Sequence, residues 1–232
     1  MMRIRAIVLV GLCCVTMSWA GASEAADPDP NRFAKDIDSF TAWDAKNAAP
    51  ADPILFVGSS SIRMWKTHDS FPDLPVVNRG FGGSHISDVL HFSDRIVLPY
   101  APKLIVFYAG DNDVAGGKSA CRVLCDYRRF VEWVHTELPD TSIIFIPIKP
   151  SGRRWSMWGE MNKANDLIEA FSGKDSRLFF ADLATPLLNA EGKPDDSLFL
   201  SDRLHLNTKG YQAWNRVLRP VMEKVLDAHR SH

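Results

Sequence analysis

The chain contains the stretch LFVGSSSIRMW at residues 55–65, and this stretch decides the fold that we expect. A run of apolar residues of strand length stops at Gly58, and three serines follow where a helix should begin. Short, unalternating apolar runs are typical of strands that are covered on both faces. The stretch therefore predicts a buried strand and a helix joined by a tight turn that presents a serine hydroxyl.

Four further apolar runs of strand length follow, with helical patterns between them. The predicted strands are residues 54–57, 76–78, 104–108, 143–148 and 178–181. The predicted helices are residues 36–48 (with Phe40 and Trp43 facing inward), 84–98, 119–138, 157–171 and 207–228. Strands that alternate with helices imply a parallel sheet with helices on both faces. We therefore predict an α/β fold, a three-layer α/β/α sandwich around a central five-stranded parallel sheet, in a single domain over residues 32–230.

Composition places the chain among ordinary globular proteins. Of its 232 residues 46% are hydrophobic and 24% are charged, and the formal net charge is -1. Nucleic-acid-binding domains usually carry a strong excess of lysine and arginine. We therefore expect no nucleic-acid partner.

The N-terminus has the layout of a secretory signal peptide over residues 1–22. Arg3 and Arg5 precede an apolar run over residues 6–20, and Ala20-Gly21-Ala22 supplies small residues for cleavage. The run is too short to span a bilayer comfortably, so we expect no stable membrane insertion after its removal. The pattern predicts a secreted or periplasmic protein, with a buried N-terminal helix as the alternative.

Removal of this segment would leave two cysteines, Cys121 and Cys125. Their spacing puts them one turn apart on a predicted helix, where the β-carbons lie farther apart than a disulfide prefers. The sequence therefore favours two unpaired cysteines, although an oxidising compartment leaves a strained bridge open.

Polar and glycine-rich segments follow three of the predicted strands. Ser59 and Ser60 come after the first strand, Gly82-Gly83 after the second, and Gly110-Asp111-Asn112 after the third. In parallel sheets the ligand crevice lies outside the carboxyl ends of the strands. We therefore expect these three segments to meet at one edge of the sheet.

The residue types in these segments are those of nucleophilic catalysis. A serine such as Ser60 needs a base, and a histidine such as His205 suits that task near neutral pH. A carboxylate on the other ring nitrogen fixes the tautomer, and Asp202 lies three residues before His205. The candidate oxyanion donors are the Ser60 and Gly83 backbone N–H groups and the Asn112 side-chain amide.

With these segments in view, the chain resembles the SGNH (GDSL-type) hydrolase superfamily, whose fold is flavodoxin-like. The resemblance rests on Gly58-Ser59-Ser60, Gly83, Gly110-Asp111-Asn112-Asp113, and the segment from Asp202 to His205. It implies esterase or lipase-type acyl hydrolysis without a metal or other cofactor. It assigns the nucleophile to Ser60, the oxyanion donors to Gly83 and Asn112, and the acid–base pair to Asp202 and His205.

The first segment departs from the family pattern. The family usually has Gly-Asp-Ser, whereas Ser59 replaces the aspartate here. Three consecutive serines also make the register ambiguous. We favour Ser60 as the nucleophile because it lies two residues after Gly58 and because Trp65 keeps the expected offset.

Each of these residues also has a structural alternative. Ser60 and Asp202 could cap the helices that follow them. Gly83 could merely permit a turn, and Asn112 could bond loop backbone. His205 could be an ordinary surface histidine.

The loop KPSGRRWSMW at residues 149–158 follows the fourth predicted strand. Trp155 and Trp158 could form an apolar or sugar-stacking wall for the substrate, with the arginines recognising an anionic group. The alternative is that both tryptophans pack the next helix onto the sheet.

The predicted function is therefore serine-dependent hydrolysis of small-molecule carboxylic esters. Acyl esters, lysophospholipids and acetylated carbohydrates all fit this chemistry. Two alternatives stay open: an acyltransferase that uses the same site, and a non-catalytic ligand-binding module of the same fold. The sequence leaves the oligomeric state open.

Overall fold

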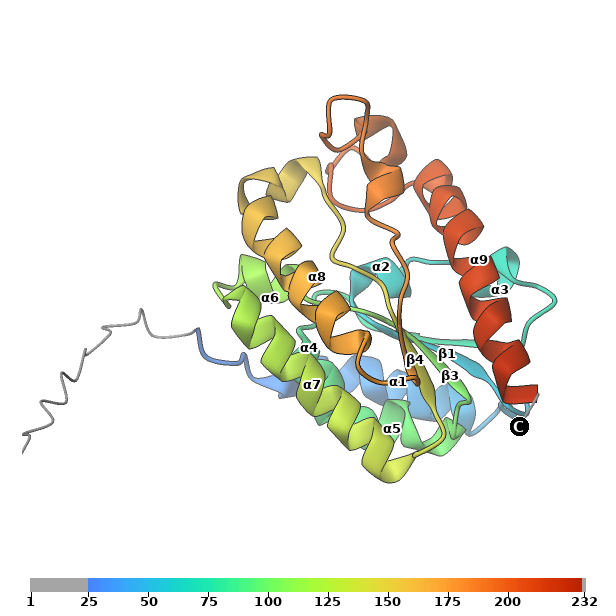
Figure 1. Cartoon of the computed structure of the whole chain (residues 1–232). Coiled ribbons are helices and arrows are strands. Elements are labelled where there is room, and N and C mark those ends of the chain that lie inside the picture. The colour runs from blue at the N-terminus through green and yellow to red at the C-terminus, as the bar shows by residue number, and fades with distance from the viewer. Residues whose placement is uncertain (1–24, 231–232) are drawn as a thin grey trace, which may run out of the picture.

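A five-stranded parallel sheet forms the centre of the computed structural model, which describes residues 25–230 (Figure 1). The strands are β1 (Ile54–Gly58), β2 (Val76–Gly80), β3 (Leu104–Tyr108), β4 (Ser142–Phe145) and β5 (Leu178–Phe180). They lie in the order β2-β1-β3-β4-β5, which is the flavodoxin-like order. The predicted sheet is confirmed. The predicted signal peptide, residues 1–22, lies outside the described residues.

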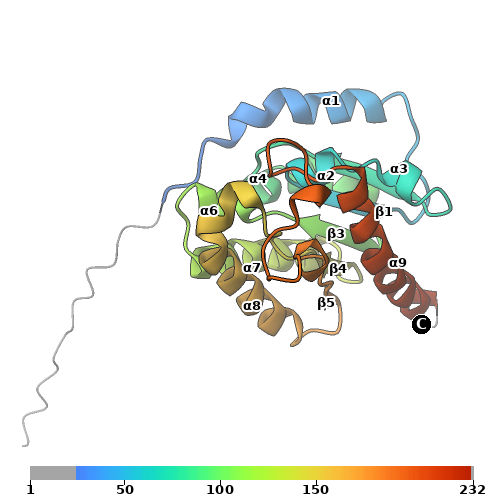
Figure 2. The same ribbon diagram turned by 90° about the horizontal axis from the view of Figure 1, so that it is seen from above.

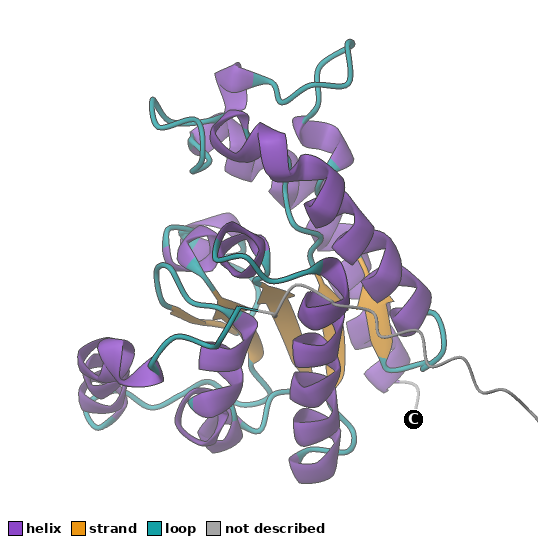
Figure 3. Cartoon of the chain, turned by 90° about the vertical axis from the view of Figure 1, so that its left-hand side faces the viewer, coloured by secondary structure: helices purple, strands orange, loops and turns teal. Residues whose placement is uncertain are grey.

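Helices cover both faces of this sheet (Figures 2 and 3). They are α1 (Ala34–Asp44), α2 (Ser60–Arg63), α3 (Thr67–Ser70), α4 (Ile86–His91), α5 (Ser93–Ile96), α6 (Asp111–Ala115), α7 (Ala120–Glu137), α8 (Trp158–Ser172) and α9 (Thr208–Arg230). Leu55 and Val57 of β1 pack toward α1, α4, α7 and α8, whereas Ile54 and Phe56 pack toward α2 and α9. The three-layer sandwich is therefore confirmed. Among residues 25–230, none of the helices has the length and apolar character needed to cross a membrane.

The single helix predicted over residues 84–98 is wrong. The structure divides this segment into α4, α5 and the 3-10 turn η2 (Leu98–Tyr100). Phe92 leaves the helical conformation, at φ -98° and ψ 7°, and packs its ring edge-on against Phe81. Pro99 then lacks the N–H that a continuing helix needs and restricts the residue before it.

The inward direction predicted for Trp43 is also wrong, because 52% of this residue is exposed. Helix α1 ends at Asp44, before the predicted end at residue 48, while Phe40 packs against the core as expected. The Trp43 ring instead lies 5.3 Å from the Arg79 guanidinium. The Arg79 cation therefore packs on the Trp43 ring, which lies outside the apolar core.

Cys121 and Cys125 lie one turn apart on α7, as predicted. Both are exposed, and neither forms a disulfide.

Candidate active site

The turn between β1 and α2 presents Ser60 at the carboxyl edge of the sheet. Gly58 ends β1 at φ +138°, and a Cβ atom there would lie 1.8 Å from the Tyr108 carbonyl oxygen. Only glycine therefore fits this position. The Ser59 amide donates to the same carbonyl oxygen at 2.9 Å. Ser60 becomes the first residue of α2, and only 9% of it is exposed.

A tight turn before α9 carries Asp202 and His205. The Asp202 carboxylate accepts hydrogen bonds from the Leu204 amide at 2.9 Å and the His205 amide at 3.0 Å. Hydrogen bonds in which an aspartate carboxylate accepts from backbone amides two or three residues later are typical of turns. Arg203, inside the turn, has φ +54°, which residues other than glycine rarely adopt. The turn brings the Asp202 carboxylate and the His205 ring together.

Ser60, His205 and Asp202 form a continuous series of hydrogen bonds. Asp202 Oδ2 lies 2.6 Å from His205 Nδ1, and His205 Nε2 lies 3.0 Å from Ser60 Oγ. An ionised carboxylate can only accept, so Nδ1 carries the proton and Nε2 accepts from the serine hydroxyl. The structure therefore brings together the three residues that the sequence assigns to nucleophile, base and orienting acid.

The Asp202 carboxyl stays ionised far below neutral pH. Partial burial acts to raise its pKa, but hydrogen bonds from the His205 ring and from the His205 and Leu204 amides lower the pKa to about 2. An ionised carboxylate holds the imidazole in one tautomer and stabilises the imidazolium that forms on proton transfer. The electrostatics of the turn therefore suit a general base at His205.

Two of the predicted oxyanion donors, Gly83 and Asn112, come from neighbouring segments, the loop after β2 and the first turn of α6 after β3. Gly83 has φ +86°, and a Cβ atom there would meet nothing within 4 Å, so the backbone conformation and not the space calls for glycine. The Asn112 amide nitrogen donates to the Ser84 carbonyl at 3.1 Å. Asn112 thus bonds loop backbone, as its structural alternative supposed. Its amide has two N–H groups, however, so this bond leaves one for a substrate.

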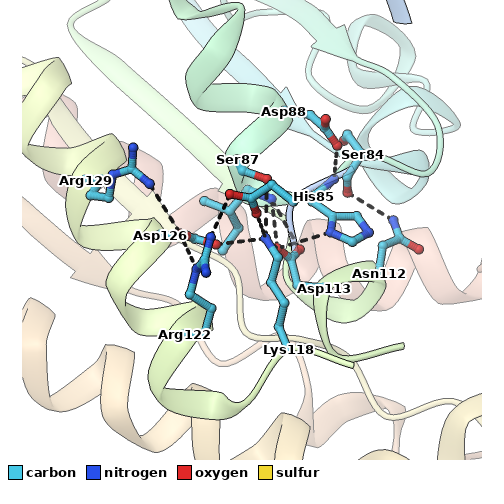
Figure 4. Close-up of polar contacts among 12 residues, drawn as sticks. Ser84, His85, Ser87, Asp88, Asn112, Asp113, Lys118, Arg122, Asp126 and Arg129 are labelled. Carbon is cyan, nitrogen blue, oxygen red and sulfur yellow. Dashed lines mark hydrogen bonds and ion pairs between the residues drawn. The ribbon is translucent and has the colours of Figure 1, made fainter. Parts of the chain in front are cut away.

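A buried charged network joins the loops that carry these donors (Figure 4). Both Asp113 carboxylate oxygens lie 3.2 Å from the Ile86 amide, which connects α6 to the start of α4. The fully buried Lys118 ammonium lies 2.8 Å from Asp113 and from Asp126. Burial raises the pKa of Asp113 to about 6, although the Lys118 cation opposes this. The network therefore ties α6, which carries Asn112, to the start of α4, which follows the Gly83 loop.

Sequence reasoning missed the contacts of Arg154, which it grouped with a substrate anion. Arg154 Nη1 lies 2.8 Å from Asp111 Oδ2, and Nη2 donates to Asn112 Oδ1 at 2.9 Å. Lys149, which is 1% exposed, lies 3.4 Å from Asp111 and 3.0 Å from the Tyr108 hydroxyl. The sequence did contain a signal for these contacts. Both cations follow β4 and Asp111 follows the neighbouring parallel strand β3, so all three lie at the same edge of the sheet.

Trp155 and Trp158 stack on each other, with ring centroids 5.9 Å apart and planes 13° apart. Both are half-buried. Trp158 packs against the apolar core, as its structural alternative supposed, whereas Trp155 lies in the 3-10 segment η3 (Gly152–Met157) outside that core cluster. The Arg153 amide donates to the Arg203 carbonyl at 3.0 Å, which attaches this loop to the turn of Asp202 and His205. Trp155 is thus the residue of the pair that does not pack on the core cluster.

A hydroxyl, an imidazole and a carboxylate in series, at the carboxyl edge of an α/β sheet, are the arrangement of a serine hydrolase. Within residues 25–230, no group of three or more His, Cys, Asp or Glu side chains is placed to hold a metal ion. The model of the GDSL-like Lipase/Acylhydrolase family matches residues 38–213. The chain belongs to this family, and its general activity is ester hydrolysis.

Solved structures support the same architecture. A GDSL-like lipase from Bacteroides thetaiotaomicron is 22% identical, with a TM-score of 0.67, covering 84% of this chain and 98% of that one. A proposed acylhydrolase from Bacteroides fragilis is 20% identical, with a TM-score of 0.70 and coverage of 87% and 100%. An acetylxylan esterase from Geobacillus stearothermophilus is 14% identical, with a TM-score of 0.60 and coverage of 73% and 94%. A search of curated protein sequences found no match.

Proposed function

We propose that the protein is a carboxylic ester hydrolase that works through an acyl-enzyme on Ser60. The observation that carries this proposal is the unbroken contact from Asp202 through His205 to the Ser60 hydroxyl. The base lies within hydrogen-bond distance of the proton that it must remove, so no rearrangement is needed before attack.

In the proposed acylation step, Ser60 Oγ attacks the ester carbonyl carbon while His205 Nε2 takes the hydroxyl proton. The charge that develops on the carbonyl oxygen faces the Ser60 and Gly83 N–H groups and the Asn112 amide. Each such donor contributes about 10²- to 10³-fold in rate. The tetrahedral intermediate then breaks its bond to the alcohol, which leaves with the proton from His205.

In the proposed deacylation step, water attacks the acyl carbonyl carbon and gives its proton to His205 Nε2. The bond from the acyl group to Ser60 Oγ breaks, and the imidazolium returns the proton to that oxygen. A carboxylic acid leaves, and the site is restored. Asp202 stays ionised throughout and stabilises each imidazolium.

Activity should fall as the pH is lowered, because a protonated imidazole cannot take the Ser60 proton. Asp202, with a pKa of about 2, stays ionised between pH 8 and pH 5, so a loss in that range does not come from this carboxylate. We expect kcat/KM on a p-nitrophenyl ester to fall about tenfold per pH unit on the acidic side. A profile that is flat from pH 8 to pH 5 would exclude a histidine base.

For the substrate, we infer an ester whose alcohol part is a carbohydrate that stacks on Trp155. The half-buried ring, its parallel partner Trp158, and the attachment of this loop to the catalytic turn support this choice. Aromatic rings present flat apolar surface on which the faces of a sugar can pack. Lysophospholipids and simple acyl esters are the competing substrate classes.

Trp155→Ala should lower the melting temperature only slightly, through the lost stacking on Trp158, and should raise KM for acetylated oligosaccharides about tenfold, because the sugar loses its stacking surface. p-Nitrophenyl acetate has no sugar that could stack on Trp155, so its KM should change by no more than about twofold. Trp158→Ala is the matched control, since this ring packs on the core and its loss should lower stability instead. Equal KM changes for both substrates would contradict carbohydrate recognition.

An active-site serine probe separates hydrolysis from binding alone. A fluorophosphonate should label the wild-type protein and fail to label Ser60→Ala. Folded wild-type protein that takes no label would favour a non-catalytic module. A product that appears only when an alcohol acceptor is added would favour the acyltransferase alternative.

We also propose that the protein is exported, on the sequence pattern of residues 1–22. N-terminal sequencing of the protein after expression in a bacterial host should find a chain that begins near residue 23. An intact N-terminus on cytoplasmic protein would contradict export.

A further inference from the structure

Arg154 holds two consecutive side chains of the segment that follows β3. One guanidinium nitrogen, Nη1, lies 2.8 Å from the Asp111 carboxylate, and the other, Nη2, lies 2.9 Å from Asn112 Oδ1. The Arg154 side chain is only 16% exposed, and its backbone, at φ -116° and ψ 20°, interrupts the helical turn of η3. This conformation directs the guanidinium toward the protein rather than toward solvent.

The contacts of Asn112 leave only one orientation for its amide. Arg154 has donors and no acceptor, so it must face the amide oxygen. The Ser84 carbonyl has an acceptor and no donor, so it must face the amide nitrogen, which lies 3.1 Å away. A flipped amide would lose both hydrogen bonds. The second N–H of Asn112 is therefore held in one fixed direction beside the Gly83 loop.

We propose that Arg154 is a positioning residue of the oxyanion hole, and this inference rests on the proposed hydrolase function. It fixes the Asn112 amide by its oxygen, so that the free N–H points at the place where the oxyanion forms. A cation bonded to the amide oxygen also polarises the amide and makes its N–H a stronger donor. Arg154 thus acts through Asn112 and does not touch the substrate itself.

Arg154 is itself held by a buried carboxylate. Asp111 is 3% exposed, and although burial acts to raise its pKa, the Lys149 and Arg154 cations lower it. The ionised Asp111 carboxylate therefore holds one guanidinium nitrogen of Arg154, and the Asn112 amide oxygen accepts a hydrogen bond from the other. The Arg153 amide bonds the Arg203 carbonyl, so the same loop also supports the acid–base turn.

The test is a double-mutant cycle on Arg154 and Asn112. Asn112→Ala should lower kcat about 10²-fold, the usual loss for one oxyanion donor. Arg154→Met should lower kcat about 10- to 100-fold with KM within about threefold, because the donor then loses its fixed direction. The double variant should be no slower than Asn112→Ala alone, since Arg154 has nothing left to position. Losses that multiply in the double variant would overturn the proposal.

Arg128→Met is the matched control, because the Arg128 side chain is 54% exposed on α7, where it pairs with Glu132 at 3.9 Å, and the site uses no part of it. It should keep kcat within about twofold, as surface substitutions usually do. If Arg154→Met fails to fold, Arg154→Lys keeps a cation near Asp111 but cannot serve both partners. Its smaller kcat loss should likewise vanish in the Asn112→Ala background.

The wild-type protein and Ser60→Ala are measured in the same assay. Their activities distinguish failure of the proposed hydrolase function from failure of the positioning role of Arg154. Activity that survives Ser60→Ala would overturn the proposed function and this inference with it. Activity that depends on Ser60, together with multiplying losses at Arg154 and Asn112, would overturn the inference alone.

Discussion

Ser60→Ala should lower kcat on every ester substrate by about 10⁴-fold or more, as removal of a triad nucleophile does in other serine hydrolases. The reason is geometric, because the Ser60 hydroxyl lies 3.0 Å from His205 Nε2 at the end of the Asp202–His205 series. The substitution removes one atom that makes no contact needed for folding. Steady-state hydrolysis and a melting curve, measured on the same preparation, check both parts of this expectation.

The two neighbouring serines are the matched controls, since all three are serines of one turn. Ser59 and Ser61 are both 0% exposed, and the Ser59 hydroxyl has no hydrogen-bond partner among the residues that the structure describes. Removing a buried hydroxyl that is already unsatisfied costs little. Ser59→Ala should therefore keep kcat within about threefold, a typical bound for a substitution that breaks no contact. A large loss in Ser59→Ala or Ser61→Ala, with Ser60→Ala still active, would show that the register is wrong.

The sheet could be predicted because its information is local. Each strand is a short apolar run, and Gly58 marks where the first one ends. Parallel topology then gathers the segments after β1, β2 and β3 at one edge, so Ser60, Gly83 and Asn112 could be grouped without coordinates. The pairing of Asp202 with His205 was local as well, because only two residues of a turn lie between them.

What could not be predicted depends on packing between distant segments. The break at Phe92 follows from the burial of its ring against Phe81, which precedes it by a whole loop and helix. The partner of Arg154 is Asn112, which belongs to another strand–helix connection. A cation in a loop has the same local pattern whether it meets solvent, substrate or a buried amide. Only the assembled sheet edge decides among these.

The Lys118 network is the clearest example, and it carries the second large effect. Lys118→Met should lower the free energy of unfolding by about 3–5 kcal/mol, the usual cost of breaking a buried ion pair from one side. Asp126 would keep the Arg122 guanidinium at 3.0 Å, whereas Asp113 would keep no cationic side chain of lysine or arginine, but only the Ile86 amide and the His85 ring at 3.7 Å. Lys103→Met is the matched control. Its ion pair with Asp52 is exposed, and its loss should cost less than about 1 kcal/mol.

The pH dependence of this deficit identifies the carboxyl that is left unpaired. In the wild-type protein, burial raises the pKa of Asp113 from 3.8 to about 6, with Lys118 opposing the rise. A carboxyl whose pKa is higher in the folded state binds more protons there, so stability falls as the pH rises between the unfolded and folded values. Without Lys118 the folded pKa rises further, and the fall extends to higher pH.

The difference in unfolding free energy between wild type and Lys118→Met should therefore be smaller at pH 5 than at pH 8, because at low pH the unpaired carboxyl is neutral. Urea titrations at the two pH values measure it. Lys118→Met combined with Asp113→Asn should lose most of this dependence, since an amide stays neutral at both. A deficit that is equal at both pH values would mean that Asp113 is not the group that Lys118 neutralises.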